Sequence, residues 1–226
     1  MEISGVIRFS LIDYPDEISC VLFTQGCNLR CPYCHNPELL ELKKGEISQE
    51  EIMRFLKERI KKISSVVITG GEPTIQKGLE DFISKLKMLG FLVKLDTNGT
   101  NPYTIDKLVN KNLLDYIAMD IKFPLDKYRL VGLNDTKVIL DSVKIIINSK
   151  IPHEFRTTYV KELLEIKDFG EIGKILEGAE KFVLQKFHKS RKIFKDIFKE
   201  QNLTEEEINT IKSIINKYVK IMEVRK

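Results

Sequence analysis

Three of the four cysteines of this chain lie within eight residues, in the segment Gly26-Cys27-Asn28-Leu29-Arg30-Cys31-Pro32-Tyr33-Cys34. Thiolates at this spacing on a loop can turn toward one centre, which suits zinc or an iron–sulfur cluster. Structural zinc sites and ordinary clusters take four protein ligands, and no later cysteine completes the set. A metal centre with three protein ligands keeps one position open, and an open position is typical of a reactive site.

The fourth cysteine, Cys20, lies in the apolar stretch 18 to 23, where a buried core thiol is expected. The alternative to an open iron–sulfur cluster is a zinc site completed by His35 or Cys20. The sequence 70 to 73, Gly-Gly-Glu-Pro, is a second unusual feature. Its glycines permit close backbone approach, and Pro73 prevents a strand from continuing.

Strand and helix patterns alternate along the chain, and they predict the element that positions each of these residues. An extended arm is predicted at 3–15. Strands are predicted over about 18–25, 66–69, 92–96, 116–122, 154–160 and 182–187, and 219–224 is a possible final strand. Helices are predicted over about 49–62, 77–89, 102–112, 136–149, 165–178 and 205–217, and a loop over 123–134. The sequence predicts a capping box of Ser48 and Glu51 at the first helix.

Six strand–helix units predict an α/β fold, a partial (β/α)6 barrel of parallel strands with the cysteine loop after the first core strand. We expect one domain over 1–226, with its core at about 16–190 and a C-terminal helical extension at about 191–226. The unusual polar residues follow strands, where ligands bind in parallel α/β folds. They are the cysteines, Gly70 to Glu72, Asn98, Lys122 and His188.

With these motifs together, the chain resembles the radical S-adenosylmethionine (SAM) enzymes, in the cysteine loop with Tyr33 before its last cysteine and in the Gly-Gly-Glu segment. More narrowly it is similar to activating enzymes of glycyl radical proteins, in particular that of anaerobic ribonucleoside-triphosphate reductase. The segments that carry this similarity are 10–15, 23–28, 34–38, 96–99, 120–122 and 155–158. Beyond residue 160 the resemblance is looser.

This resemblance implies one 4Fe–4S cluster bound by Cys27, Cys31 and Cys34, with SAM at the open iron. The implied SAM contacts are Tyr33, His35, Gly70, Gly71, Glu72, Asp96, Thr97, Asn98, Asp120, Lys122, Arg156 and His188. Glu72 is expected near the cofactor's ammonium group and Tyr33 against the adenine. Each has an ordinary alternative: a turn for residues 96 to 99, a solvated Lys122, a structural ion pair for Arg156, and a surface position for His188.

The implied activity is reductive cleavage of SAM to a 5′-deoxyadenosyl radical that takes hydrogen from a substrate. The implied partners are a glycyl radical enzyme as protein substrate, because an incomplete barrel leaves a wide opening, and a ferredoxin or flavodoxin as electron donor. Two alternatives remain: a small-molecule radical enzyme similar to 7-carboxy-7-deazaguanine synthase, and a zinc-stabilised binding module. Iron and sulfide analysis separates the last from the others.

Composition limits the classes of partner. The formal net charge of +4 over 226 residues does not indicate nucleic-acid binding, and the lysines are spread along the chain. No apolar run is long enough to span a bilayer, and no leader pattern is present at Met1, so we expect a cytoplasmic protein without membrane contact. One cysteine cluster without a second set agrees with a reducing compartment.

Overall fold

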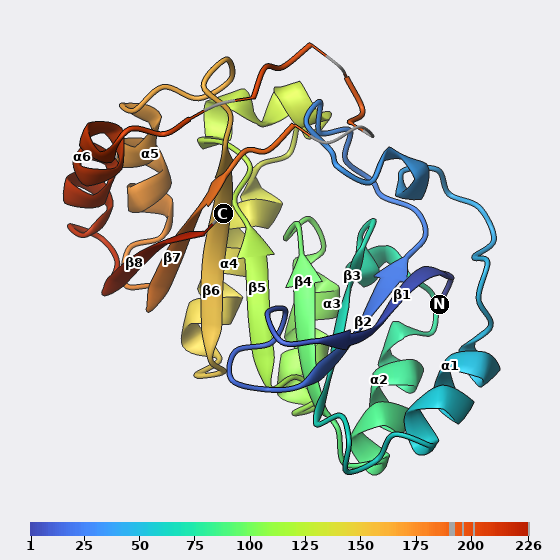
Figure 1. The fold of residues 1–226 in the computed structure, drawn as a ribbon. Helices are drawn as coiled ribbons and strands as arrows, with labels where there is room; N and C mark the ends of the chain where they lie inside the picture. Colours follow the sequence, from blue (N-terminus) through green and yellow to red (C-terminus); the bar gives the residue numbers. More distant parts are fainter. Residues whose placement is uncertain (190–192, 196, 201, 226) are drawn as a thin grey trace. The chain divides into compact units, whose positions relative to one another are not determined.

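A computed structural model describes residues 1–189, 193–195, 197–200 and 202–225 (Figure 1). The chain divides into two compact units, each built from segments that are distant in sequence. Unit 1 comprises Met1–Asn28, Glu38–Thr97 and Tyr103–Ile117, and unit 2 comprises Leu29–Pro37, Asn98–Pro102 and Ala118–Lys226. The boundary at Asn28 falls inside the cysteine loop, so Cys27 belongs to unit 1 and Cys31 and Cys34 belong to unit 2.

Unit 1 contains four neighbouring strands: β1 (Ile3–Ser10), β2 (Ser19–Thr24), β3 (Ser65–Gly70) and β4 (Leu92–Thr97). Strand β1 pairs with β2 antiparallel, whereas β2, β3 and β4 are parallel. Val66, Val67 and Ile68 of β3 are fully buried, as expected for a strand covered on both faces. The arm expected at 3–15 is therefore largely a strand that extends the sheet.

The helices of unit 1 are α1 (Gln49–Lys57), α2 (Leu79–Met88) and most of α3 (Pro102–Asn110), with short 3-10 helices η1 (Pro37–Leu39) and η2 (Pro73–Ile75). Ser48 caps α1, because its side chain accepts a hydrogen bond from the Glu51 backbone N–H at 3.1 Å. Helix α1 ends at Lys57, earlier than the predicted residue 62. Lys61 has a left-handed backbone with φ of 71°, which a continuing helix cannot contain.

Strand β5 (Tyr116–Asp120) begins in unit 1 and ends in unit 2. Just before it, the Asp115 N–H donates to the Val93 carbonyl oxygen of β4 at 2.8 Å. Just after it, the Ile121 N–H donates to the Arg156 carbonyl oxygen at 2.8 Å. Within each unit, the strands follow one another in chain order.

Unit 2 adds β6 (His153–Tyr159), β7 (Lys181–Lys186) and β8 (Ile221–Arg225), all parallel. Its helices are α4 (Lys137–Asn148), α5 (Asp168–Ile175) and α6 (Glu205–Ile215). Thr204 and Glu207 form a capping box at the start of α6. The expected C-terminal helical extension thus contains one helix and also β8, whose Arg225 binds the buried Glu154 carboxylate of β6 through two hydrogen bonds of 2.7 Å.

The predicted α/β class with parallel core strands is confirmed, and one element was predicted wrongly. Residues 123–134 were expected to form a loop, but Leu125–Val131 forms the 3-10 helix η3. This helix buries the whole of Tyr128 and ends at Gly132, whose φ of 86° suits glycine. In the described part of the chain, no helix combines the length and apolar character required to cross a bilayer.

Candidate functional site

The start of the cysteine loop is held by backbone hydrogen bonds within unit 1. The Gly26 N–H donates to the Leu39 carbonyl oxygen at 2.8 Å, and the Cys27 N–H donates to the Leu40 carbonyl oxygen at 3.2 Å. Gly26 has a φ of 98°, which only glycine adopts readily. The Cys27 side chain is therefore presented from a backbone fixed on the segment that follows the loop.

The glycine pair after β3 packs directly against this loop. A Cβ atom added to Gly71 would lie 2.1 Å from the Gly26 carbonyl oxygen, closer than any side chain permits. The Glu72 N–H donates to the same carbonyl oxygen at 2.8 Å, and the Gly71 N–H donates to the Thr24 carbonyl oxygen at 2.9 Å. The close approach expected from two glycines is thus an approach of β3 to the cysteine loop.

Glu72 is 1% exposed and connects the ends of β3 and β4. Its Oε1 atom accepts hydrogen bonds from the Thr74 N–H at 3.0 Å and the Thr74 hydroxyl at 2.6 Å. The Thr97 hydroxyl, at the end of β4, donates to the same oxygen at 2.6 Å. Two predicted site residues, Glu72 and Thr97, are therefore in direct contact.

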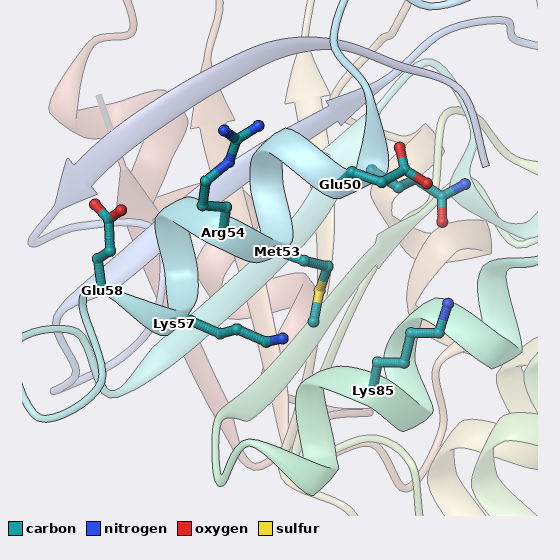
Figure 2. A pocket seen from close by; sticks show the side chains of 7 residues that line it. Glu50, Met53, Arg54, Lys57, Glu58 and Lys85 are labelled. Atoms are coloured by element: carbon teal, nitrogen blue, oxygen red, sulfur yellow. The ribbon is translucent and has the colours of Figure 1, made fainter.

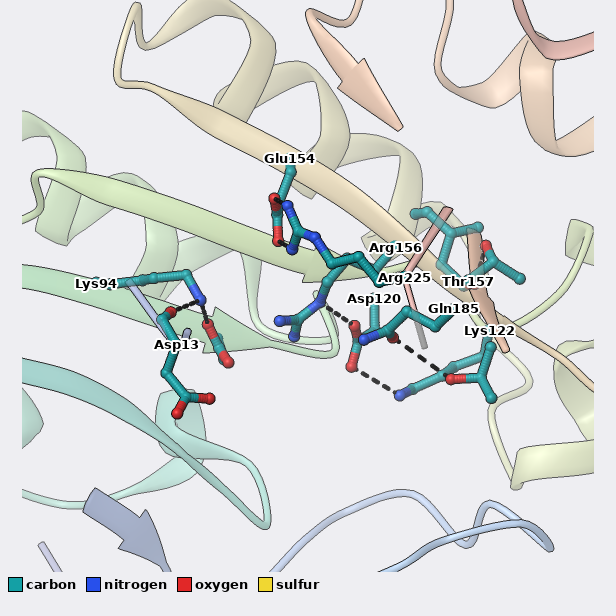
Figure 3. A network of polar contacts seen from close by, with 12 residues as sticks. Asp13, Lys94, Asp120, Lys122, Glu154, Arg156, Thr157, Gln185 and Arg225 are labelled. Atoms are coloured by element: carbon teal, nitrogen blue, oxygen red, sulfur yellow. Dashed lines mark hydrogen bonds and ion pairs between the residues drawn. The ribbon is translucent and has the colours of Figure 1, made fainter. Parts of the chain in front are cut away.

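A buried lysine that sequence reasoning missed lies beside Asp96. Lys94 is 3% exposed, and its ammonium group lies 2.9 Å from Asp96 Oδ1 and donates to the Asp13 carbonyl oxygen at 2.7 Å (Figure 3). It also lies above the Tyr116 ring, 5.9 Å from the ring centroid. The signal in the sequence was a lysine inside an otherwise apolar strand, which a solvated position explains poorly.

In unit 2, the rest of the cysteine loop is equally constrained. The Cys34 N–H donates to the Cys31 carbonyl oxygen at 3.0 Å, which forms a tight turn between the two thiols. The Arg30 N–H donates to the Val131 carbonyl oxygen of η3 at 2.9 Å. The Phe194 and Lys195 N–H groups donate to the carbonyl oxygens of Cys34 and Pro32, each at 3.0 Å.

Tyr33 and His35 flank Cys34 and differ in their surroundings. Tyr33 is 4% exposed and packs edge-on against Phe123, and burial raises its pKa. Its hydroxyl has no hydrogen-bond partner in the described residues. His35 stacks on Phe187 with an interplanar angle of 22°, and its Nε2 atom lies 2.7 Å from the His188 carbonyl oxygen. His35 is thus bound through its ring to the end of β7.

Asp120, Lys122 and Arg156 form a compact ion-pair group at the end of β5 and the middle of β6. Arg156 Nε donates to Asp120 Oδ1 at 2.8 Å, and Lys122 Nζ donates to Asp120 Oδ2 at 2.9 Å (Figure 3). Burial alone would raise the pKa of Asp120, but the two cations outweigh it and hold that pKa well below its usual range. Burial would lower the pKa of Lys122, but Asp120 outweighs it and raises that pKa.

The 3-10 helix η3 supports this ion-pair group. The Tyr128 hydroxyl of η3 accepts a hydrogen bond from the Lys122 N–H at 3.2 Å. Tyr128 is fully buried, and burial raises its pKa well above the usual value. The element that was predicted to be a loop therefore fixes the backbone at Lys122.

Two other predicted site residues have local partners. Asn98 Oδ1 accepts hydrogen bonds from the Thr100 N–H at 3.0 Å and the Thr100 hydroxyl at 2.6 Å, which is a turn motif. His188 is exposed, and its Nδ1 atom lies 3.0 Å from Glu200 Oε1. These contacts correspond to the turn and surface alternatives for the two residues.

Comparison with known proteins identifies the family. The model of the radical SAM superfamily matches residues 21–170. This chain belongs to the radical SAM superfamily. The matched region contains the three loop cysteines, the Gly-Gly-Glu segment and the Asp120 ion-pair group.

Relatives within the superfamily include activating enzymes. A protein of Methanocaldococcus jannaschii, named as a candidate glycyl-radical enzyme activating enzyme, is 34% identical over 99% of this chain and 95% of its own length. A pyruvate formate-lyase-activating enzyme of Staphylococcus aureus is 32% identical over 74% of both chains. A candidate GTP 3′,8-cyclase of Pyrococcus horikoshii is 30% identical over 79% of this chain but 60% of its own length.

A solved structure shares the fold. SuiB of Streptococcus suis, bound to its precursor peptide SuiA, superposes with a TM-score of 0.71 at 14% identity. The match covers 91% of this chain and 48% of SuiB, so this chain spans about half of that protein. The radical SAM relatives show that this chain is an enzyme, and the cofactors of its superfamily are a 4Fe–4S cluster and SAM.

The donor set of the loop fits an iron–sulfur cluster. All four cysteines lie in described residues, and none forms a disulfide bond. Cys20 is 0% exposed within β2, as expected, and burial raises the pKa of its thiol to about 12. No three His, Cys, Asp or Glu side chains within the described ranges are already grouped as a metal site, so the assignment of the three ligands stays a prediction.

A surface pocket lies apart from these residues. It has a volume of about 530 Å³ and lies beside α1 and α2 in unit 1 (Figure 2). Its lining is mixed in charge and consists of Gln49, Glu50, Met53, Arg54, Lys57, Glu58 and Lys85. None of the predicted cluster or cofactor residues contributes to it.

Proposed function

We propose that this enzyme activates a glycyl radical enzyme by generating a radical on a glycine of that partner. The observation that carries the proposal is the match in both identity and length to the M. jannaschii relative, which covers nearly all of both chains. A match of this kind leaves no room for an additional substrate domain in that relative. The pyruvate formate-lyase-activating enzyme adds a second activating enzyme with comparable identity.

Cys27, Cys31 and Cys34 are the proposed ligands of the 4Fe–4S cluster, and SAM is the proposed ligand of its open iron. When bound, the reduced cluster supplies the electron that cleaves a sulfonium bond of SAM. The protein's contribution is to orient the cofactor and exclude water. Backbone hydrogen bonds fix Gly26 and Cys27 within unit 1 and Cys34 within unit 2, which supports a role for these residues in holding the cluster.

Two polar groups match the two charged ends of the amino-acid part of SAM. The group of Glu72, Thr74 and Thr97 carries a formal charge of −1 and suits an ammonium. The group of Asp120, Lys122 and Arg156 carries a formal charge of +1, from one carboxylate and two cations, and suits a carboxylate. We assign these two roles to Glu72 and to the Lys122 and Arg156 cations.

The remaining predicted contacts keep their proposed roles in cofactor binding. Tyr33 offers a buried ring and a hydroxyl that lacks a partner among the described residues, which suits the adenine. Gly70 and Gly71 permit the close approach of β3, and Asp96 is oriented by Lys94. Asn98 supports the cofactor site through the turn that it forms with Thr100. His35 and His188 support it through the contact between the His35 ring and the His188 carbonyl oxygen.

Replacing each loop cysteine tests the cluster assignment. Cys27→Ala, Cys31→Ala and Cys34→Ala should each lose nearly all cluster iron after anaerobic reconstitution, because three thiolates are needed to hold it. Cys20→Ala is the matched control and should keep iron and sulfide at the level of the unmodified protein. Loss of iron in the control, or full iron content in a loop variant, would overturn the assignment.

Anaerobic ribonucleoside-triphosphate reductase is the proposed partner, on the strength of the sequence segments that resemble its activating protein. The test mixes reduced enzyme, SAM and the reductase and records the electron paramagnetic resonance spectrum. A glycine-centred doublet is expected, with one 5′-deoxyadenosine formed for each radical. A doublet with pyruvate formate-lyase and none with the reductase would keep the activity and replace the partner.

The second candidate is a small-molecule radical enzyme, favoured by the similarity to the P. horikoshii relative. This chain spans 60% of that relative, so the remainder of that protein has no counterpart in the match. Consumption of GTP or of a pterin substrate, with no glycyl radical on either protein partner, would replace the activase proposal.

A further inference from the structure

The chain returns to the cysteine loop after β7. We call the described residues 187–189, 193–195 and 197–200 the basic segment. Two of its backbone N–H groups, at Phe194 and Lys195, bind the carbonyl oxygens of Cys34 and Pro32. Its inner face is aromatic: Phe187 stacks on His35, and Phe198 packs edge-on against Phe187 with ring centroids 6.0 Å apart.

The opposite side of this segment faces solvent. Lys189, Lys195 and Lys199 are exposed, and Phe194 and Ile197 are 40% and 70% exposed. Among the described residues of the segment, Glu200 is the acidic one; its carboxylate accepts a hydrogen bond from the Lys189 N–H at 2.5 Å and lies beside His188. The exposed surface therefore has two apolar side chains among three lysines, directly over the backbone of Pro32 and Cys34.

We propose that the basic segment is the docking surface for the acidic one-electron carrier protein that reduces the cluster. The charge of this surface indicates an acidic partner, because three lysines attract an acidic protein and repel a basic one. The position of the basic segment also supports the proposal. Electron transfer slows steeply with distance, and this segment is hydrogen-bonded to the backbone of the loop that contains Cys34. A small apolar patch with a charged rim is typical of weak, transient redox complexes.

The proposed redox step is the transfer of one electron. The carrier loses one electron, the cluster gains one, and no covalent bond forms between the two proteins. The proposal rests on the radical SAM cofactors and does not depend on which glycyl radical enzyme is the partner.

The test reverses the three lysine charges together, as Lys189→Glu, Lys195→Glu and Lys199→Glu. The segment should stay attached, because its bonds to the cysteine loop come from backbone N–H groups and not from these side chains. The matched control reverses three exposed lysines of the same unit, Lys212, Lys217 and Lys220. Both proteins are reconstituted with the cluster, and 5′-deoxyadenosine formation is measured without any glycyl radical enzyme.

Each protein receives either reduced flavodoxin as the acidic carrier or reduced methyl viologen as a small donor. With flavodoxin at low salt, the segment variant should show a KM for the carrier raised by about 10-fold or more. Added salt should weaken carrier-driven turnover of the unmodified enzyme and narrow this difference. With methyl viologen, the segment variant and the control should match the unmodified enzyme within about twofold.

Three results would overturn the proposal. The first is an equal rise in KM for the control, which would mean that net charge alone matters. The second is an equal loss with methyl viologen, which would make the segment a structural support of the loop. The third is an unchanged KM of the segment variant for flavodoxin at low salt. Failure of the unmodified enzyme to cleave SAM with methyl viologen would instead refute the proposed function.

Discussion

The carboxylates of Glu72, just after β3, and Asp120, at the end of β5, are satisfied in different ways, and Glu72 is buried whereas the Asp120 side chain is 25% exposed. In unit 1, Glu72 receives three hydrogen bonds on one oxygen from the neutral groups of Thr74 and Thr97. In unit 2, Asp120 receives one cation on each oxygen, from Arg156 and Lys122. The first group keeps a net negative charge and the second a net positive charge, although each has a carboxylate at its centre.

This difference separates two functions of a carboxylate at a strand end. Asp120 organises two cations, so its charge is needed to keep them in place. Glu72 is itself the charged group, and the threonines orient it while leaving its formal charge unchanged. Removing the charge should therefore cost more stability at Asp120 and more affinity for the ligand at Glu72.

The largest expected loss of stability is at Asp120. Asp120→Asn removes the charge that binds both Lys122 and Arg156, which should lower the free energy of unfolding by about 3 kcal/mol. Urea denaturation at neutral pH measures it. Glu80→Gln is the matched control, because the Glu80 side chain is as exposed as that of Asp120 and also binds two cations, but its partners Lys107 and Lys111 are 44% and 51% exposed, against 17% and 12% for Lys122 and Arg156. A control loss as large as that of Asp120→Asn would show that burial does not distinguish the two ion-pair groups.

Glu72→Gln should change stability less and ligand binding more. Glutamine keeps an oxygen for the threonine donors, so the free energy of unfolding should fall by only about 1 kcal/mol. Affinity for SAM, measured by calorimetry on the reconstituted protein, should fall about 10- to 100-fold with the lost charge.

Thr74→Val is the control for that variant. It removes one hydrogen bond to the same Glu72 oxygen but keeps the carboxylate, and Thr74 is outside the predicted cofactor contacts. Its affinity for SAM should stay within about threefold of the unmodified protein, with a stability loss of about 1 kcal/mol. Equal affinity losses in both variants would assign Glu72 a structural role alone.

The smallest expected effect is the pH dependence of the contribution that Asp120 makes to the free energy of unfolding. Its pKa is lowered on folding, so its stabilisation is present above the unfolded pKa of about 3.9 and is lost as pH falls through the folded pKa. The pKa of Lys122 is raised, so its contribution is lost only above about pH 10. The stability difference between Asp120→Asn and the unmodified protein should be flat from about pH 5 to 9 and shrink below about pH 4. A smaller stability difference near neutral pH than at pH 5 would contradict the lowered pKa of Asp120 and the raised pKa of Lys122.

Local patterns predicted most of the elements because their causes are local. The capping residue Ser48 and the apolar strand 66 to 68 depend on neighbours within a few residues. Helix η3 was missed because its short 3-10 turn lacks the periodicity of a long helix, and its burial depends on Tyr128 reaching the Lys122 backbone.

The site was predicted as a set of residues, but their mutual contacts were not. The contact of Asp120 with Arg156 joins residues 36 positions apart, and that of Lys94 with the Asp13 backbone joins residues 81 positions apart. The His35 ring meets a backbone carbonyl of His188, and residue types carry no signal for such a contact. The roles of these side chains in cofactor binding stay predictions.

Because Cys20 is buried and the other cysteines lie in the loop, the reactivity of the four thiols reports separately on the fold and on the cluster. The Cys20 thiol is covered within β2 and has a pKa of about 12, so an alkylating reagent at neutral pH should reach it only when the core opens. Among the loop thiols, Cys34 is partly exposed and Cys27 and Cys31 are each 8% exposed, so once the metal leaves they should react sooner than Cys20. Counting alkylated cysteines by mass spectrometry would thus distinguish, within one preparation, molecules that have lost their cluster from molecules that have lost their fold.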